Sequence, residues 1–118
     1  MSYYFDIDGE TVWDAGSRSG RLYASLAEGA AEFMDLPSGL APNSQGGCDI
    51  ELPVFRTFVE GLYETYSSTR NPVLHGVVRG LLIASLVVLE VGGAPIKLKP
   101  EHEETFREDK VIFARAMG

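Results

Sequence analysis

The sequence is short of several residues and motifs, and each shortage removes a class of function. It has one cysteine, Cys48, in 118 residues, which excludes an internal disulfide and a zinc site built from cysteines. Neither Gly-x-Gly-x-x-Gly nor a phosphate-binding loop occurs, so the strongest signatures of nucleotide enzymes are missing. The longest apolar stretch, residues 80–93, holds only about a dozen apolar residues, whereas a membrane span needs about 20. No secretory signal opens the chain, and we expect a cytoplasmic protein.

Basic residues are scarce in the first half of the chain. Residues 1–60 contain three bases and ten acids, a balance of 3 − 10 = −7, whereas residues 61–118 contain seven of each. The whole net charge of −7 therefore belongs to the first half. We expect neither nucleic acid nor an anionic membrane as a partner, and either simple solubility or attraction of a basic protein as the role of this charge.

The composition, with 45% hydrophobic and 23% charged residues, is typical of a single soluble domain, here residues 1–118. We predict a mainly α (α+β) fold that begins with a β-hairpin over residues 3–14. Asp8-Gly9 is its turn, because this dipeptide favours two residues with positive φ. Residues 36–52 are rich in proline and glycine and are predicted to form a long loop, with an extended segment at its end.

Four helices are predicted, over residues of about 19–34, 53–67, 72–91 and 100–116. The third is apolar on all sides between Leu81 and Leu89 except at Ser85, so we expect the others to pack around it. In the first helix Leu22, Leu26, Ala30, Phe33 and Met34 recur at helical spacing opposite Glu28 and Glu32, and Ser17 or Ser19 is its expected cap. Residues 96–99 alternate and predict a further short strand.

Asp6-Ile7-Asp8-Gly9 resembles the first motif of the haloacid dehalogenase phosphatases. That resemblance implies a nucleophilic Asp6 and an acid/base Asp8. Glu10, however, stands where the family has threonine, and the alternating strands and helices of its parallel sheet are absent. We interpret the motif as a hairpin turn and expect no catalytic residues and no enzyme activity.

The leading hypothesis is a non-enzymatic domain that binds a protein partner, most concretely an immunity protein that blocks a basic nuclease-type toxin. Tyrosine and tryptophan anchor protein interfaces and acids steer basic partners; a subunit of a larger complex would use the same features. The residues assigned to this surface are Tyr3, Tyr4, Asp6, Asp8, Glu10, Trp13, Asp14, Asp49 and Glu51. Their spacing lacks the pattern of a calcium loop, and we expect neither metal nor cofactor.

An alternative hypothesis is a small-ligand site or minor enzyme between the second and third helices. His75 and Arg79 lie four residues apart and so share a helix face, where Tyr63 and Tyr66 would complete a pocket for an anion. The opposing interpretation is that both belong to a polar first turn, with Arg79 paired to a surface acid. His102 has no second histidine at zinc-site spacing and is expected at a solvated helix start.

The motifs "YYFDI", "VW" and "LPSG", together with one hydrophobic helix, resemble a group of small uncharacterised actinobacterial proteins. This resemblance implies a stand-alone domain and no particular activity. A second copy of the chain is a further expected partner if the third helix is not fully covered by its own neighbours.

Overall fold

The N-terminal segment forms a β-hairpin. In the computed structural model, which describes residues 2–117, strand β1 (Ser2–Ile7) pairs antiparallel with β2 (Glu10–Gly16). Asp8 and Gly9 connect the strands with φ values of 50° and 82°, the left-handed conformations that a two-residue hairpin turn requires. The predicted hairpin and its turn are therefore confirmed.

Two further strands lie in the segment predicted as a loop. β3 (Leu40–Pro42) and β4 (Cys48–Ile50) pair with each other, and β4 pairs parallel with β1, so the sheet order is β2-β1-β4-β3. Gly47 allows this approach, since a Cβ on it would lie 2.1 Å from the carbonyl oxygen of Tyr4. β4 is the extended segment predicted at the end of the loop, whereas β3 was not predicted because three residues carry too little alternation to be recognised among prolines and glycines.

The expected four helices are α1 (Ser17–Met34), α2 (Leu52–Ser68), α3 (Pro72–Val91) and α4 (Pro100–Ala116). Asn71 caps α3 as its sequence predicts, because its side-chain oxygen accepts hydrogen bonds from the amides of Val73 and Leu74 at 2.9 and 3.1 Å. The predicted serine cap of α1 is wrong: the cap position is Gly16, which has no side chain to accept a bond, and Ser17 is already helical.

The strand predicted at 96–99 is also wrong, because residues 94–99 have no regular secondary structure. The carbonyl oxygens of Ala94 and Pro95 instead accept hydrogen bonds from the Arg56 guanidinium, at 3.3 and 3.2 Å.

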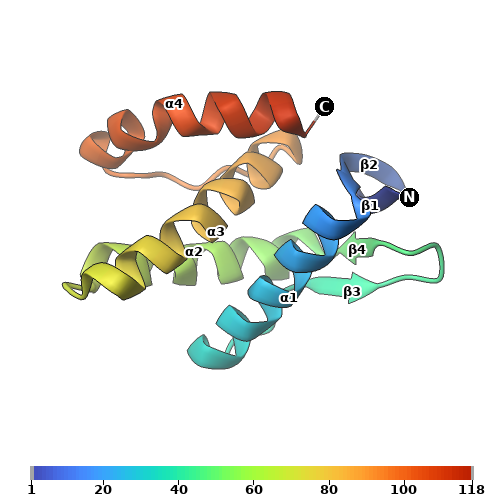
Figure 1. Ribbon diagram of the computed structural model, residues 1–118, viewed down its shortest axis with the longest axis horizontal. Helices are drawn as coiled ribbons and strands as arrows, with labels where there is room; N and C mark the ends of the chain where they lie inside the picture. Colours follow the sequence, from blue (N-terminus) through green and yellow to red (C-terminus); the bar gives the residue numbers. More distant parts are fainter. Residues whose placement is uncertain (1, 118) are drawn as a thin grey trace.

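α3 is the centre of the core, as predicted. Every residue from Leu82 to Leu89 is buried, Ser85 included. α3 runs diagonally between α4 and α2, while the sheet and α1 lie toward one end of the molecule (Figure 1). The apolar residues of α2 face the same core, where Phe55, Phe58 and Val59 are completely buried.

α3 is long and apolar enough to span a membrane by length and composition, with a mean hydropathy of 2.0 over 18 residues, of which 56% are buried inside the domain. The apolar character thus extends beyond residues 80–93 to the start of the helix. A buried core helix has the same composition as a membrane span.

α1 turns a different face inward from the one its sequence suggests. Gly20, Tyr23, Ala27 and Ala31 are its buried residues, whereas the predicted apolar positions Leu22, Leu26 and Phe33 are 61%, 49% and 68% exposed. Small side chains let the inner face come close to the sheet: a Cβ on Gly20 would lie 2.6 Å from the Tyr3 ring. Periodicity alone cannot choose between two apolar faces on one helix.

Candidate functional site

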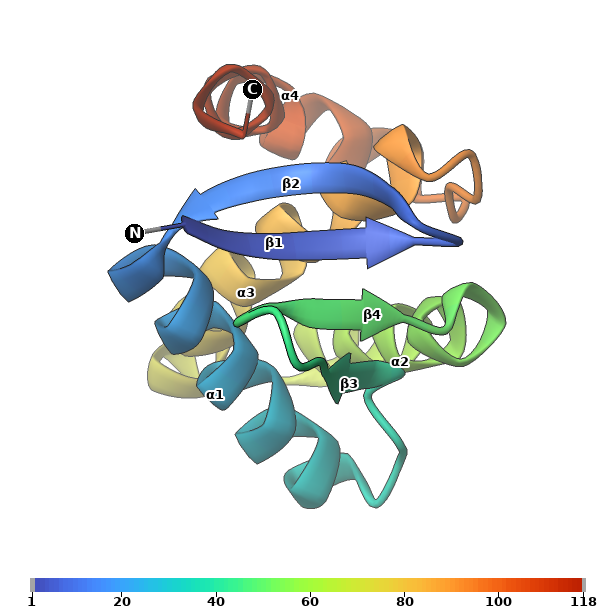
Figure 2. The same ribbon diagram turned by 90° about the vertical axis from the view of Figure 1, so that its right-hand side faces the viewer.

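The outer face of the sheet carries four side chains that are in register across three strands. Asp14 on β2 lies opposite Tyr4 on β1, and Asp6 on β1 lies opposite Asp49 on β4. Alternate residues of a strand share a face, so Tyr4 and Asp6 lie on the same side of β1. Figure 2 shows the strands in front of α3, and on that inner side Phe5 and Trp13 pack against the Tyr23 ring of α1. We call these four residues the acidic sheet face.

Within the described part of the chain, the carboxylates around this face have no cationic partner. In residues 2–117, no basic side chain lies within salt-bridge distance of these acids, whereas the ion pairs described there join residues of α2, α3 and α4. Asp6 accepts a hydrogen bond from the Thr11 hydroxyl at 2.7 Å, and Asp49 accepts one from the Asn43 amide at 3.3 Å. The negative charge of the first half of the chain is therefore not neutralised locally. The acids concerned are Asp6, Asp8, Glu10, Asp14, Asp49 and Glu51.

The acids continue around one edge of the sheet. Because β1 and β4 are parallel, their carboxyl ends lie at the same edge, where Asp8 follows β1 and Glu51 follows β4. Asp8, Glu10 and Glu51 are all exposed. Seven of the nine predicted partner-binding residues, the six acids and Tyr4, thus belong to one surface, although the sequence separates Asp14 from Asp49.

Two of the three aromatic residues assigned to this surface point to the inner side of the sheet, Trp13 buried and Tyr3 half-buried, which corrects the prediction. Trp13 is buried and stacks on Phe5, with ring centroids 4.8 Å apart. The hydroxyl of Tyr3 lies 3.1 Å from Sγ of Cys48 beneath the sheet. Only Tyr4, which is 39% exposed, faces outward, because neighbouring residues of a strand point to opposite sides and Tyr3 shares its side with Phe5.

The four residues of the predicted small-ligand pocket do not surround one hollow. Tyr66 is buried and stacks on His75 at a centroid distance of 3.9 Å. Arg79 forms an ion pair with Asp109 at 2.7 Å, as expected from the opposing interpretation, in which Arg79 pairs with a surface acid. Tyr63 lines a hollow of about 450 Å³ that includes none of the other three residues.

The surroundings of His102 differ from those predicted. It is half-buried rather than solvated, and its Nδ1 lies 2.6 Å from the Tyr63 hydroxyl. That hydroxyl also accepts a hydrogen bond from the Lys99 amide at 2.8 Å, so one oxygen contacts both the residue before α4 and the imidazole of His102. The contact joins α2 to α4, and nothing in the local sequence around His102 signals it because Tyr63 is 39 residues away.

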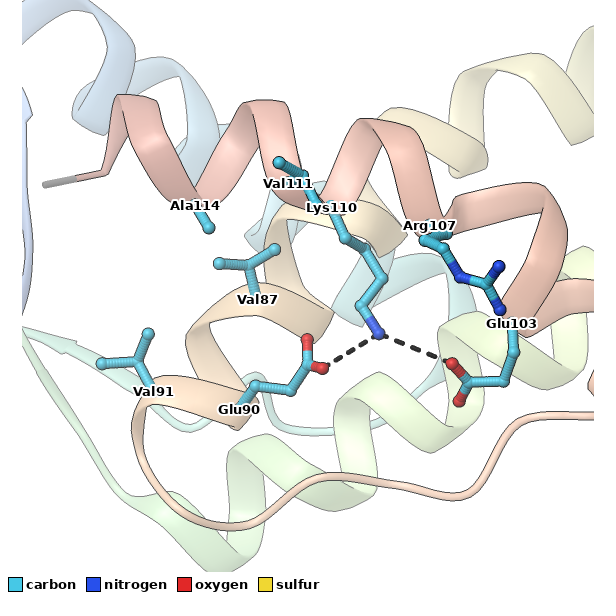
Figure 3. A pocket seen from close by; sticks show the side chains of 8 residues that line it. All are labelled: Val87, Glu90, Val91, Glu103, Arg107, Lys110, Val111 and Ala114. Carbon is cyan, nitrogen blue, oxygen red and sulfur yellow. Dashed lines mark ion pairs between the residues drawn. The ribbon is translucent and has the colours of Figure 1, made fainter.

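A hollow of about 480 Å³ lies between the C-terminal half of α3 and the length of α4 from Glu103 to Ala114 (Figure 3). Nζ of Lys110 lies 2.9 Å from Glu90 and 3.8 Å from Glu103, and its side chain is only 17% exposed. Because the lysine is neutralised by carboxylates from both helices, we interpret this group as a connection between α3 and α4.

A second hollow, of about 490 Å³, is mostly apolar and opens between α1, α3 and α4. Leu22 and Leu26 of α1 form one wall, Gly80 and Ala84 belong to α3, and Phe113 of α4 forms the opposite wall. Its exposed leucines are the residues that the sequence analysis expected in the core. This hollow was not predicted.

No group of three or more histidine, cysteine, aspartate or glutamate side chains in residues 2–117 could hold a metal ion. Cys48 is buried, and burial raises the pKa of its thiol, with the carboxylates of Glu28 and Asp49 acting in the same direction. A thiol in such surroundings is a poor nucleophile.

Comparison with known proteins gives a family but no activity. Neither the curated proteins nor the solved structures contain a match. The model of a protein family of unknown function, DUF6086, matches residues 1–118. The chain therefore belongs to the DUF6086 family.

Proposed function

We propose that this chain is a non-enzymatic protein-binding domain whose acidic sheet face binds a basic surface of another protein. The observation that carries the proposal is the set of carboxylates in register around the exposed Tyr4, with no base of residues 2–117 paired to them. Five acids of α2, α3 and α4 form ion pairs with bases of those helices, whereas none of the acids around the sheet does within residues 2–117.

The physical argument combines charge with an aromatic anchor. Unpaired carboxylates attract a basic partner over distances of about 10 Å at ordinary salt and raise the rate of encounter. Tyr4 then supplies apolar area and a hydroxyl at the centre of the contact, with few rotamers to immobilise. A sheet supports these side chains on a rigid backbone, so little ordering accompanies binding.

An immunity protein that blocks a basic nuclease-type toxin is the most concrete form of this function. The groove of such a toxin holds phosphates, and carboxylates spaced along a sheet would occupy their positions. A subunit of a larger assembly would use the same charge complementarity.

Charge reversal on the sheet tests the proposal. The variant Asp14→Lys/Asp49→Lys changes two exposed positions, and Glu101→Lys/Glu108→Lys makes the same change of net charge on α4. Tagged chains are incubated with a native extract of the producing cells at about 50 mM and about 500 mM salt, a range over which screening becomes severe. We expect wild type and the α4 variant to retain the same basic protein at low salt, and the sheet variant to lose it.

Equal retention by all three chains, or retention of an acidic protein that survives high salt, would overturn the proposal. Tyr4→Ala supplies a second measurement: we expect it to lower the affinity for the captured protein about tenfold or more, as a central aromatic anchor does. Circular dichroism of each variant establishes that the fold is intact.

A further inference from the structure

We propose that α1 binds a second copy of this chain through its exposed apolar residues, with the two α1 helices antiparallel. The residues concerned are Leu22, Leu26, Gly29 and Phe33, which we call the α1 stripe. They lie on one side of the helix by their spacing of four, three and four residues. This surface contains no residue of the acidic sheet face, so the two proposals are independent.

The α1 stripe is part of a larger apolar surface. Leu22 and Leu26 form a wall of the 490 Å³ hollow whose other residues include Leu81 and Ala84 of α3. The same face of α3 continues toward its N-terminus through Val77 and Val73, which are 67% and 74% exposed. Single exposed apolar residues are common, but a contiguous apolar surface over two helices marks a place where another protein binds.

Two glycines on this surface have no role within one chain. A Cβ added to Gly29 or Gly80 would meet nothing within 4 Å, although each sits inside a helix, where glycine costs about 1 kcal/mol relative to alanine. Neither packing nor a positive φ within the chain requires the missing side chain. A missing side chain does, however, let another chain approach the helix backbone closely.

The charges beside the α1 stripe select a second copy as its occupant. Arg18 and Arg21 lie in the first turns of α1, whereas Glu28, Glu32 and Asp35 lie in its last turns or at its cap. In residues 2–117 no acid lies within salt-bridge distance of either arginine. The helix is thus basic at one end and acidic at the other.

In an antiparallel pair of α1 helices, opposite charges lie beside each other, and a leucine of one copy occupies the space left by the missing side chain of Gly29 in the other. If Leu26 faces Leu26 across a twofold axis, Arg18 of each copy lies beside Glu32 of the other, and Leu22 lies over Gly29. Twofold symmetry repeats every such contact, and the antiparallel helix dipoles attract as well. Binding to an unrelated helix gives no reason for α1 to be basic at one end and acidic at the other, whereas antiparallel self-association does.

Sedimentation equilibrium of the full chain tests the proposal. We expect wild type to form dimers with increasing concentration, and Leu26→Glu to raise the dissociation constant by at least about tenfold, since two carboxylates would meet at the centre of the contact. Ile112→Glu is the matched control. Because Ile112 is 53% exposed on α4 and lies outside the α1 stripe, this variant should dimerise with the dissociation constant of wild type.

A charge exchange distinguishes this arrangement from any other dimer. Arg18→Glu should weaken the dimer, and Arg18→Glu/Glu32→Arg should restore it. The two positions are about 21 Å apart along the helix axis, so the restored pair can form only between chains. A monomeric wild type, a dimer that survives Leu26→Glu, or an exchange that restores nothing would each overturn the proposal; a monomer that instead captures a different protein through Leu26 would identify another occupant.

Discussion

Tyr23 illustrates how a single hydroxyl connects two helices of this domain. Its side chain is buried, and its hydroxyl lies 2.7 Å from Oγ of Ser85, the one polar residue in the buried part of α3. Ser85 in turn donates a hydrogen bond to the carbonyl oxygen of Leu81 at 2.8 Å. Tyr23 therefore donates its proton to Ser85, and the serine that interrupts the apolar helix has a partner for both its proton and its oxygen.

Buried phenols and a buried thiol make the protein sensitive to alkali. Burial raises the pKa of Tyr3 to about 12, with a further contribution from its hydrogen bond to Cys48, and burial also raises the pKa values of Tyr23 and Cys48. All three groups hold their protons more tightly in the folded chain than in the unfolded chain. The stability from these neutral forms is therefore complete below the unfolded pKa values and is lost as the pH rises.

We expect the free energy of unfolding to fall between about pH 9 and pH 12, with Tyr23 contributing a slope of up to about 1.4 kcal/mol per pH unit above pH 10. Urea denaturation at a series of pH values measures it. Tyr23→Phe should make the decline less steep. A slope that is equal in wild type and this variant would show that Tyr23 ionises as readily when folded as when unfolded.

At the scale of elements, the sheet depends on one position without a side chain. β1 and β4 come from segments about 40 residues apart in sequence, and Gly47 lies beside the backbone of Tyr4 where they meet. Hydrophobic alternation predicts β1 and β2 because each has a full period of inner and outer residues. β3 and β4 are too short for such a pattern: β4 is held by its pairing with β1, and β3 by its pairing with β4.

Gly47→Ala should destabilise the protein by about 3 kcal/mol, because the added methyl group has to displace the carbonyl oxygen of Tyr4 and with it the pairing of β1 and β4. Urea denaturation measures the change. Gly76→Ala is the matched control, since a Cβ there meets nothing within 4 Å; in the interior of α3 alanine should stabilise the protein by up to about 1 kcal/mol. Equal stabilities for the two variants would contradict the packing of β4 on β1.

At the scale of the whole molecule, α4 is the helix least embedded in the core. Phe106 is its one buried residue, whereas α3 buries nine. Three further contacts near Phe106 join α4 to α3. The Arg79 guanidinium lies 5.6 Å from the centroid of the Phe106 ring and forms an ion pair with Asp109, and Lys110 forms an ion pair with Glu90. Because Phe106 is the one side chain of α4 that is completely buried, we expect its ring to contribute most to the docking of this helix.

Hydrogen exchange should therefore show α4 opening before α2 and α3. We expect Phe106→Ala, which removes a completely buried ring, to cost about 3–5 kcal/mol and to expose the amides of α4 selectively. Ile112→Ala, on the exposed side of the same helix, should change the exchange little. Simultaneous loss of protection in α2, α3 and α4 would indicate one cooperative unit instead.

Local signals in the sequence were sufficient to predict much of the structure of this molecule. The Asp8-Gly9 turn, the Asn71-Pro72 start of α3 and the apolar residues from Leu82 to Leu89 each determine their structure through contacts within a few residues or through burial on every side. The uneven charge was also legible from the sequence, because it is a property of composition. These features do not depend on which other segment lies next to them.

The tertiary structure alone decided which faces are inward and which surfaces are available. Tyr3 and Trp13 are inside and Tyr4 is outside, and α1 buries Tyr23 while Leu22 and Phe33 remain exposed. A periodic pattern shows that a face exists, but its direction depends on distant segments, such as Cys48 beneath Tyr3 and Ser85 beside Tyr23. The acidic sheet face and the α1 stripe both result from the direction in which each element faces, since each consists of side chains that the core does not bury.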